Sequence, residues 1–545
     1  MSNTRYRLGR MPGAVAALVA AVALVMAGCT GEGRASQRAT SGSAASPAAQ
    51  EAVPPAPVTI AGYYKQKLDW RPCSGGFQCA RLLVPVDYRH PAGSRFSLPV
   101  VRLPAADPAR RIGSIVLNPG GPGGSGVEYA RQASKVLSAA VLARFEVVGF
   151  DPRGVGGSQP AIRCMTGPQL DRYLDTDDNP ANSAELSTVI AESRFFAQAC
   201  ARADGPLLPY VGTAEAARDM DILRAALGDR KLTYLGKSYG TYLGTYYAQL
   251  FPRNVRALVL DGAIDPADTA IDQNIVQAQG FQVAFRSFAA DCVKRPDCPL
   301  GSAATASSGD TSSGDAADSG GSGAAVDAAV ARLQALLNRA GQTPLANDLG
   351  DGRPGNEALV TAGVLSALYS KAYWPLLRTG LQDAIAGDGT VLIELADALM
   401  ERKANGTYSN LAESNMAINC VDRPWPRALS TWRAAALTAQ RDAPQFGEAI
   451  MWGSLPCAYW QVRGARVPSM HAAGAPPILV VGTTRDPATP YHWAQALAAD
   501  LSSGVLLGWN GDGHTAYKMG SSCVDTIVDR YLIDGGVPKS GTVCS

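Results

Sequence analysis

The chain contains 545 residues, which is enough for one large α/β domain with insertions or for several smaller domains. Lys and Arg total 49 and Asp and Glu total 47, so the formal net charge is +2, and the absence of a long block of like charges argues against nucleic-acid binding. Hydrophobic residues make up 46% of the chain and charged residues 18%, a composition typical of a globular protein and not of a disordered one.

The N-terminal segment predicts export and attachment to a membrane. The first ten residues contain three arginines and no acidic residue, and small apolar residues follow from Ala14 to Ala27, which is the layout of a secretory signal. The segment Met26–Cys29 resembles a bacterial lipobox, which implies that residues 1–28 are a lipoprotein signal peptide and that the Cys29 thiol is acylated. The alternative is an uncleaved membrane anchor, because residues 11–28 approach the length that spans a bilayer. Either way, we expect the domain at the extracellular face of the cell membrane.

The next segments predict a linker and then an α/β domain. Residues 29–58 are rich in Ser, Ala, Gly, Thr, Pro and Gln and contain few large apolar residues, so we expect a flexible linker. From residue 59 onward, short apolar runs end in Gly- or Asp-rich turns, and helical patterns follow several of them. This repeat predicts an eight-stranded, mostly parallel sheet that opens with an antiparallel hairpin. The expected strands are 80–86, 98–103, 114–117, 145–150, 232–235, 257–260, 478–481 and 505–507.

The pattern changes between residues 266 and 475, where Ala- and Leu-rich helical stretches replace the strand–turn signature. We expect a helical domain over 266–475, inserted after the sixth strand, with a first core part at 59–265 and a second core part at 476–545. Within it, residues 301–328 are dominated by Ser, Gly and Ala and contain no Lys or Arg, which predicts a disordered surface insertion.

The cysteines agree with export. Ten remain when Cys29 is set aside, and an even number in an exported chain favours disulfides. No C-x-x-C pair occurs and the chain has only four histidines, so no metal site is expected. Our hypothesis is sequential pairing: 73 with 79, 164 with 200, 292 with 298, 420 with 457, and 523 with 544.

The pentapeptide G-K-S-Y-G at residues 236–240 matches the G-x-S-x-G nucleophile elbow. It follows the expected strand at 232–235 directly and precedes a helical pattern at 241–250, which is the strand–turn–helix context that the motif requires. The flanking glycines allow strand and helix to approach closely, and the helix N-terminus favours developing negative charge. We therefore predict that Ser238 is a nucleophile.

A serine hydroxyl needs a base within hydrogen-bond reach, and the chain has four histidines to supply one. His514 lies in a Gly-rich turn just after the last expected strand, where its ring can reach the top of the sheet. His90 lies in the opening hairpin turn, His471 in a Gly/Ala linker and His492 at the start of a helix. His514 is therefore the predicted base.

The carboxylate that orients the base is expected between Ser238 and His514, because α/β-hydrolases run in the order Ser, Asp or Glu, His. Asp486 lies at the tip of the turn after the expected strand 478–481. Asp512 is the alternative, although a residue only two positions before His514 has difficulty facing its Nδ1 atom. We predict Asp486.

An oxyanion needs two fixed N–H donors, one from the residue after the nucleophile and one from a loop after the third strand. Tyr239 supplies the first, and the Gly/Pro-rich loop 118–126 supplies the second, for which we choose Gly121. The loop also reads G-x-G-x-x-G over 121–126, but an internal proline and its place after the third strand argue against a dinucleotide site. The turn at 151–158 is interpreted as structural.

As an ordered set, these motifs resemble the proline iminopeptidase and tripeptidyl aminopeptidase branch of the α/β-hydrolase superfamily, especially the exported actinobacterial tripeptidyl aminopeptidases. The resemblance implies an α/β-hydrolase fold whose eight-stranded core carries a helical cap after the sixth strand, with a TAP-like C-terminal region at 476–545. It also implies release of short peptides, tripeptides above all, from free N-termini through an acyl-enzyme on Ser238. The resembling segments are 118–126, 151–154, 236–240, 419–422, 485–490 and 513–514.

An exopeptidase must recognise the α-ammonium group of its substrate, and a carboxylate in the cap is the natural partner. Glu413 and Asp422, near the end of the cap, are the candidates, and a structural role for both around Cys420 stays open. The partners expected are therefore peptides with a free N-terminus, and the membrane through Cys29; no cofactor is expected. A carboxylesterase or lipase with the same triad is the alternative function, whereas a catalytically silent binding lipoprotein would not need the triad.

Overall fold

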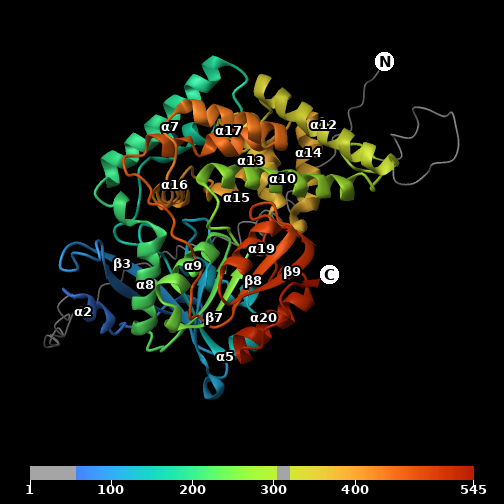
Figure 1. The fold of residues 1–545 in the computed structure, drawn as a ribbon. Helices are drawn as coiled ribbons and strands as arrows, with labels where there is room; N and C mark the ends of the chain where they lie inside the picture. Colours follow the sequence, from blue (N-terminus) through green and yellow to red (C-terminus); the bar gives the residue numbers. More distant parts are fainter. Residues whose placement is uncertain (1–56, 303–319) are drawn as a thin grey trace, which may run out of the picture.

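The structure, a computed structural model, describes residues 57–302 and 320–545. The sheet and its flanking helices form the lower half of the molecule, and a thick layer of further helices lies above them (Figure 1). The predicted signal peptide, Cys29 and nearly all of the predicted linker lie outside the described residues. In the part of the chain that is described, no helix is both long and apolar enough to cross a membrane.

Ten strands form the sheet. They are β1 Arg71–Pro72, β2 Gln78–Pro85, β3 Arg95–Leu103, β4 Gly113–Asn118, β5 Phe145–Phe150, β6 Leu232–Lys237, β7 Val255–Asp261, β8 Ile478–Arg485, β9 Gly504–Asp512 and β10 Thr542–Cys544. Their spatial order is β1-β2-β3-β5-β4-β6-β7-β8-β9-β10. The pairs β1–β2, β2–β3 and β3–β5 are antiparallel. All the other neighbouring pairs, from β5–β4 to β9–β10, are parallel.

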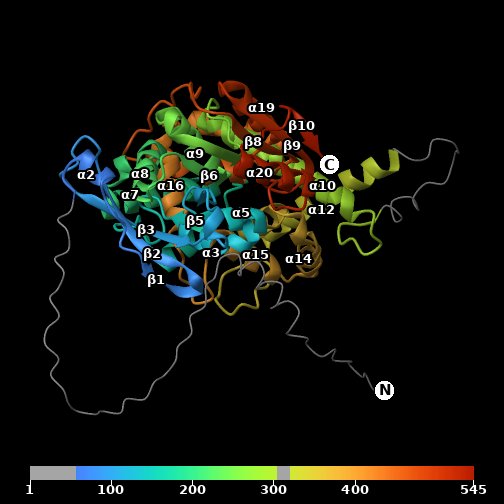
Figure 2. The same ribbon diagram turned by 90° about the horizontal axis from the view of Figure 1, so that it is seen from below.

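The predicted fold class is confirmed, but the predicted count of eight strands is wrong. β1 and β10 add a strand at each edge of the sheet, and Figure 2 shows the β1–β3 side and the β9–β10 side at opposite ends. These two strands have only two and three residues, so neither shows a hydrophobic pattern of its own. The eight longer strands overlap the predicted ones, and the central parallel strands β4 to β7 are almost entirely buried, as an α/β core requires.

Helices cover both faces of the sheet because alternate strand residues point to opposite sides. On β8, Val480 packs into one apolar cluster, while Leu479 and Val481 pack into the other. The first cluster includes α8 Thr213–Ala226, α9 Tyr239–Leu250 and α19 Tyr491–Asp500. The second includes α3 Gly126–Arg131, α4 Ala133–Val136, α5 Ala139–Arg144 and α20 Ser522–Asp534.

Between β7 and β8, after the sixth of the predicted strands, the described residues form eight α-helices. They are α10 Ala270–Cys292, α12 Gly320–Gln342, α13 Glu357–Leu368, α14 Trp374–Ala386, α15 Thr390–Met400, α16 Leu411–Asp422, α17 Leu429–Asp442 and α18 Gly447–Gly453. The predicted disordered insertion 301–328 needs correction, because α12 already begins at Gly320. Within α12, alanine, which has the highest helix propensity, is common only from residue 324 onward, and the first turn of the helix is rich in glycine. Residues 303–319 lie outside the described part.

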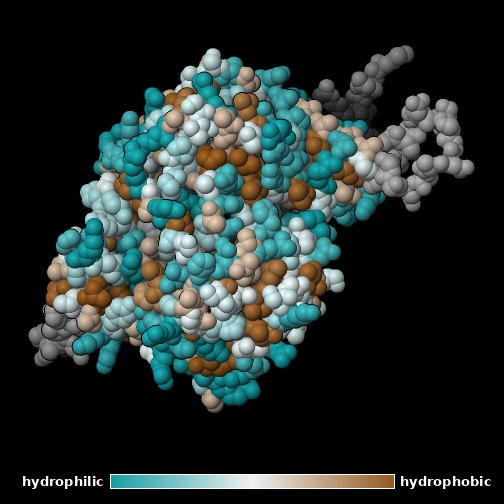
Figure 3. Space-filling view, in the orientation of Figure 1, coloured by the Kyte–Doolittle hydropathy of each residue, from teal (hydrophilic) through white to brown (hydrophobic). Residues whose placement is uncertain are grey.

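Two further helices, α6 Gly167–Leu174 and α7 Ser183–Asp204, follow β5 and also join the upper layer. Val189 of α7 packs in one apolar cluster with Trp432 of α17 and Met451 of α18, and Figure 1 shows α7 beside α17. We call α6, α7 and the helices from α10 to α18 the cap. The cap therefore includes a segment that the sequence assigned to the first core part. On the face shown in Figure 3, hydrophobic residues form small groups among hydrophilic ones, as on an ordinary water-exposed surface.

The disulfides confirm the sequential pairing. Cys73 pairs with Cys79, Cys164 with Cys200, Cys292 with Cys298, Cys420 with Cys457, and Cys523 with Cys544. Two of them tie parts of the cap: one joins the chain before α6 to α7, and the other joins α16 to the 3-10 helix Leu455–Tyr459. In the unfolded chain such crosslinks restrict the accessible conformations, which stabilises the folded state.

The turn at 151–158 is held by a fully buried ion pair. The Arg153 guanidinium donates to both carboxylate oxygens of Asp219, at 2.7 and 2.6 Å, and neither side chain is exposed. The remaining donors reach the carbonyl oxygens of Pro85, Val86 and Tyr210. Because every donor has a partner, the cost of burying this charge is offset, and the turn is fixed against β2 and α8.

Candidate active site

Ser238 lies in the sharp turn between β6 and α9. Its backbone has φ 57° and ψ −126°, a strained conformation for a residue with a side chain. A Cβ atom on Gly236 would lie 2.3 Å from the carbonyl oxygen of Gly240, and one on Gly240 would lie 2.9 Å from that of Asn118. The close approach of strand and helix thus requires both glycines of the motif.

His514 and Asp486 are in direct contact. The Nδ1 atom of His514 lies 2.8 and 3.0 Å from the two carboxylate oxygens of Asp486. The Asp486 carboxylate is buried and also accepts hydrogen bonds from the backbone N–H groups of Ala488, Thr489 and Thr515. These donors fix the carboxylate, and the carboxylate in turn fixes the imidazole with its Nε2 atom on the opposite side of the ring.

The alternative carboxylate, Asp512, points elsewhere. It accepts hydrogen bonds from the Arg485 guanidinium, the Ser287 hydroxyl and the Lys371 ammonium group, at 2.5, 2.6 and 3.2 Å. The guanidinium of Arg485 beside it lowers the pKa of Asp512 against the effect of burial. The geometry therefore matches the choice of Asp486 and gives Asp512 other partners.

The Nε2 atom of His514 is buried and makes no hydrogen bond to any residue in the two described ranges. His514 lines the same cavity as Ser238. Its Nε2 atom is therefore available to accept a proton in that cavity. Tyr369 holds the ring from the cap side, with ring centroids 5.3 Å apart, and its carbonyl oxygen accepts the His514 N–H at 2.8 Å. Burial raises the pKa of the Tyr369 phenol to about 12, so it stays neutral.

A buried Lys–Asp pair beneath the site was missed by sequence reasoning. Lys237 and Asp261 are register partners on β6 and β7, with Nζ and Oδ2 3.6 Å apart. Lys237 donates to the carbonyl oxygen of Tyr517 at 2.7 Å, and Asp261 accepts the N–H groups of Ala516 and Tyr517. The pair thereby fixes the chain that follows His514. The only sequence signal was a lysine inside the elbow motif and an aspartate at the end of the next strand.

The predicted oxyanion donors lie on one wall of this cavity. The Gly120 N–H donates to Asn118 Oδ1 at 2.9 Å, and a Cβ atom on Gly120 would lie 2.5 Å from the Lys237 carbonyl oxygen and 3.0 Å from Tyr239 N. The loop therefore rests directly on the elbow. Gly121 has φ 110°, which only glycine adopts readily, and the Tyr239 N–H is at the first position of α9, where helices leave donors unpaired.

The cavity between sheet and cap has a volume of about 1,890 Å³. Nine carboxylates and four Lys or Arg side chains line it, and four of the carboxylates, Glu128, Glu192, Asp351 and Asp397, pair with arginines. No three acidic, His or Cys side chains of the described residues are grouped so that they could hold a metal ion. The lining carboxylates are Glu128, Asp151, Asp178, Glu192, Asp351, Glu394, Asp397, Glu401 and Asp422.

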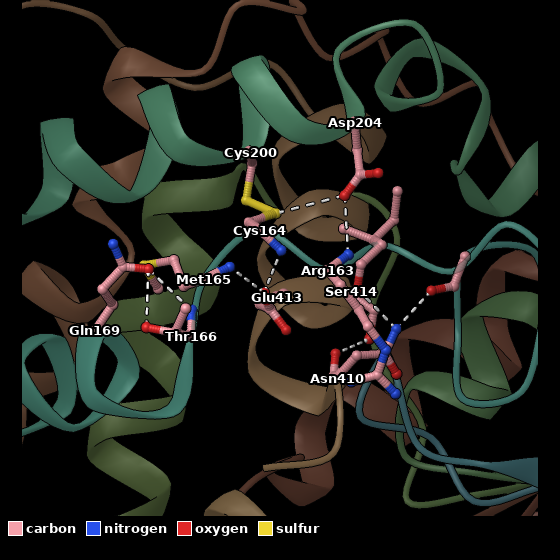
Figure 4. The surroundings of a disulfide bond; sticks show 12 residues. Arg163, Cys164, Met165, Thr166, Gln169, Cys200, Asp204, Asn410, Glu413 and Ser414 are labelled. Atoms are coloured by element: carbon pink, nitrogen blue, oxygen red, sulfur yellow. Dashed lines mark hydrogen bonds between the residues drawn. A yellow bond between two sulfur atoms is a disulfide. The ribbon is translucent and has the colours of Figure 1, made fainter. Parts of the chain in front are cut away.

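Glu413 does not fit the predicted role in binding a substrate ammonium group. Its carboxylate accepts hydrogen bonds from the N–H groups of Cys164 and Met165, beside the Cys164–Cys200 disulfide (Figure 4). The cavity lining, in the part of the chain that the structure describes, does not include Glu413. Glu413 therefore fixes the loop before α6, which corrects the prediction and favours the structural alternative.

Asp422, in contrast, lines the cavity and connects to the elbow. Its carboxylate accepts the N–H of Thr213 at 2.7 Å and also the Thr213 hydroxyl, whose oxygen lies 2.5 Å from the Tyr239 hydroxyl. Because the Thr213 proton is donated to Asp422, the Tyr239 hydroxyl must be the donor to Thr213. Burial raises the pKa of Asp422 to about 7, against the opposing effects of Thr213 and Arg423.

The other three histidines lie outside the cavity lining of the described chain. His90 is exposed and pairs with Asp87, and the His471 ring contacts the Asp500 carbonyl oxygen. The predicted lipidation site, Cys29, lies outside the described residues.

Two family profiles match the chain. One, described as "alpha/beta hydrolase fold", matches residues 113–321, and the other, described as "TAP-like protein", matches residues 443–544. Serine protease Hip1 of Mycobacterium tuberculosis is 38% identical over 499 residues, which cover 88% of this chain and 91% of that protein. Carboxylesterase B of the same organism is 40% identical over 480 residues, 86% of each chain. Tripeptidyl aminopeptidase of Streptomyces coelicolor is 32% identical over 492 residues, 88% of this chain and 86% of that protein.

Proposed function

The chain belongs to the α/β-hydrolase family and is a serine hydrolase with a TAP-like C-terminal region, and from that premise we propose that it is an exopeptidase. It releases short peptides, tripeptides above all, from free N-termini. The observation that carries this proposal is the Asp422 carboxylate in the wall of the Ser238 cavity, connected through Thr213 to Tyr239. Two of the relatives are named as peptidases, which supports the same substrate class.

The reaction proceeds in two halves on Ser238. Its hydroxyl oxygen attacks the carbonyl carbon of the scissile amide while His514 Nε2 takes the proton, and Asp486 stabilises the resulting imidazolium. The backbone N–H groups of Tyr239 and Gly121 bind the oxyanion. His514 then gives its proton to the leaving amine. Water, deprotonated by His514, hydrolyses the acyl-enzyme and releases the N-terminal peptide.

Asp422 supplies the recognition of the free N-terminus. A carboxylate has about four acceptor positions, and Thr213 occupies two of those on Asp422, so others remain for an ammonium group in the cavity. In a partly desolvated site this ion pair favours a charged amine over an acylated one. An extended segment of three residues spans roughly 10 Å. Asp422 and Ser238 line the same cavity, and we propose that the position of Asp422 relative to Ser238 sets the length of the released peptide.

The first prediction concerns Asp422→Asn. We expect this variant to lose about 10- to 100-fold in kcat/KM on free-amine tripeptide anilides, because a charged hydrogen bond is worth roughly 1.5–3 kcal/mol. The N-acetylated anilides should lose far less. The matched control is Glu413→Gln, a carboxylate of the same helix that lies outside the cavity lining. Equal losses on both substrate types in Asp422→Asn would refute the assignment.

The second prediction is a pH window for selectivity. The raised pKa of Asp422, about 7, leaves this carboxyl protonated and uncharged at lower pH, so it can pair with an ammonium group only above that value. A peptide α-amino group loses its own charge above about pH 8. The ratio of kcat/KM for free-amine to N-acetylated anilides should therefore peak between these values. Ionisation of the triad affects both substrates equally, so it does not change this ratio. A ratio that does not vary with pH in the wild-type enzyme would contradict the role of Asp422.

A carboxylesterase is the second candidate function, because a relative of 40% identity bears that name and the triad serves esters as well as amides. The Asp422 carboxylate in the cavity favours the exopeptidase function, since a neutral acyl chain carries no charge that could pair with it. Turnover of short acyl esters without turnover of free-amine anilides would decide for the esterase.

We further propose that the enzyme works outside the cytoplasm, held at the membrane by acylated Cys29. The basic and apolar N-terminal sequence and the five disulfides support this location. Metabolic labelling with a fatty-acid probe tests it: the label should appear on the wild-type chain and disappear in Cys29→Ala.

A further inference from the structure

Asp512 lies where β8 and β9, the strands that lead to Asp486 and His514, meet the cap. Its side chain is 8% exposed, and its partners come from three different elements. Arg485 is the last residue of β8 and directly precedes Asp486, whereas Ser287 lies on α10 and Lys371 in the 3-10 helix Lys371–Tyr373. One carboxylate thus joins the strand of Asp486, the loop of His514 and two parts of the cap.

The same loop has further contacts with the cap. Gly513 forms an isolated β-bridge with Ser370, and the His514 N–H donates to the Tyr369 carbonyl oxygen at 2.8 Å. Gly513 has φ 107°, a conformation that favours glycine, the residue whose backbone is least restricted. The core holds the chain on both sides, through the β8–β9 pairing as far as Asp512 and through Lys237–Asp261 after His514, whereas Gly513 and the His514 N–H make these backbone contacts with the cap.

Loss of the Asp512 charge would also loosen the end of β8. Arg485 donates to Asp512 at 2.5 Å, and the two residues are register partners on β8 and β9. Because Arg485 directly precedes Asp486, this ion pair fixes the backbone from which the triad carboxylate projects.

We infer that Asp512 is a positioning residue through which the cap holds the catalytic base His514 in place. The cap then acts on the rate of the chemical step as well as on the choice of substrate. The inference rests on the Ser–His–Asp part of the proposed function and not on the identity of the acyl substrate.

The test compares Asp512→Asn and Ser287→Ala in the full chain. Ser287→Ala removes the 2.6 Å hydrogen bond from the cap but leaves the Arg485–Asp512 pair in the core intact. The matched control is Asp327→Asn, an exposed cap carboxylate paired with Arg286. Three readouts are used: kcat and KM on a short acyl ester, the same constants on a free-amine tripeptide anilide, and the rate at which a fluorophosphonate labels Ser238.

For Asp512→Asn we expect kcat on both substrates and the labelling rate to fall about 10-fold with KM unchanged, because small misplacements of a base cost rate. Ser287→Ala should lower the same quantities several-fold, and Asp327→Asn should change none of them. A change confined to a higher KM for the anilide would overturn the inference, since the contacts would then serve substrate binding alone. Unchanged kcat and labelling rates would overturn it as well.

The design separates this inference from the proposed function. If wild type fails to cleave the anilide, the exopeptidase proposal fails, while the ester and the labelling rates still decide the role of Asp512. If Asp512→Asn does not fold, as judged by its thermal melt, Ser287→Ala decides: reduced labelling supports the inference and wild-type labelling overturns it.

Discussion

Replacing Ser238 by alanine is expected to lower kcat by about 10⁶-fold on every substrate that the enzyme accepts, the size of loss measured when a triad serine is removed. The reason is the elbow geometry: Ser238, with its strained backbone, lines the cavity at the turn between β6 and α9, next to Tyr239 and in the same cavity as His514. KM should change little, because the alanine leaves the cavity and its carboxylates intact.

The measurement is steady-state turnover of a free-amine tripeptide anilide, together with fluorophosphonate labelling of intact protein. Ser454→Ala is the matched control, since Ser454 lines the same cavity from the cap. This control should keep wild-type rates and labelling. Residual activity of Ser238→Ala within about 100-fold of wild type would mean that another nucleophile acts, because the oxyanion hole and binding alone leave only a small residual rate.

Asp486→Asn is expected to lower kcat by about 10⁴-fold. An amide at this position can present its NH₂ group to His514 Nδ1, which selects the tautomer whose proton is on Nε2 and so blocks the base. In either placement the NH₂ group replaces an oxygen that accepts at least one of the three backbone N–H groups, so a donor then faces a donor. Deletion of the charge removes the stabilisation of the imidazolium as well.

The comparison with Asp512→Asn makes this prediction specific. Both changes convert an aspartate near His514 to asparagine, but only Asp486 contacts the imidazole. We expect a loss of four orders of magnitude in one and about one order in the other. Thermal melts of both variants exclude unfolding as the cause. Equal losses, or a larger loss in Asp512→Asn, would contradict the assignment of the triad carboxylate.

The sheet and the site could be predicted where the signal is local. The elbow motif with its flanking strand and helix predicted the turn at Ser238, and chain order together with turn position predicted the contact between His514 and Asp486. The short edge strands β1 and β10 were not predicted, because two or three residues show no hydrophobic periodicity. Likewise α6 and α7 read simply as helices, since nothing in an amphipathic pattern tells whether its apolar face packs on a sheet or on other helices.

The carboxylates of α16 show the same limit. Glu413 and Asp422 were both candidates for binding the substrate ammonium group, yet a helix with 3.6 residues per turn places residues nine positions apart on opposite faces. Helical geometry could therefore have excluded one of them, but only the tertiary structure shows that Asp422 faces the cavity. The Lys237–Asp261 pair needed the strand register, which links residues far apart in the chain.

The central claim is release of short peptides from free N-termini, and one measurement tests it most directly. A synthetic decapeptide and its N-acetylated form are incubated with the enzyme and with Ser238→Ala, and the products are identified by mass spectrometry over time. We expect successive release of N-terminal tripeptides from the free peptide alone, and no products with the variant. Cleavage of the acetylated peptide at internal bonds, or no cleavage of either peptide by an enzyme that hydrolyses acyl esters, would contradict it.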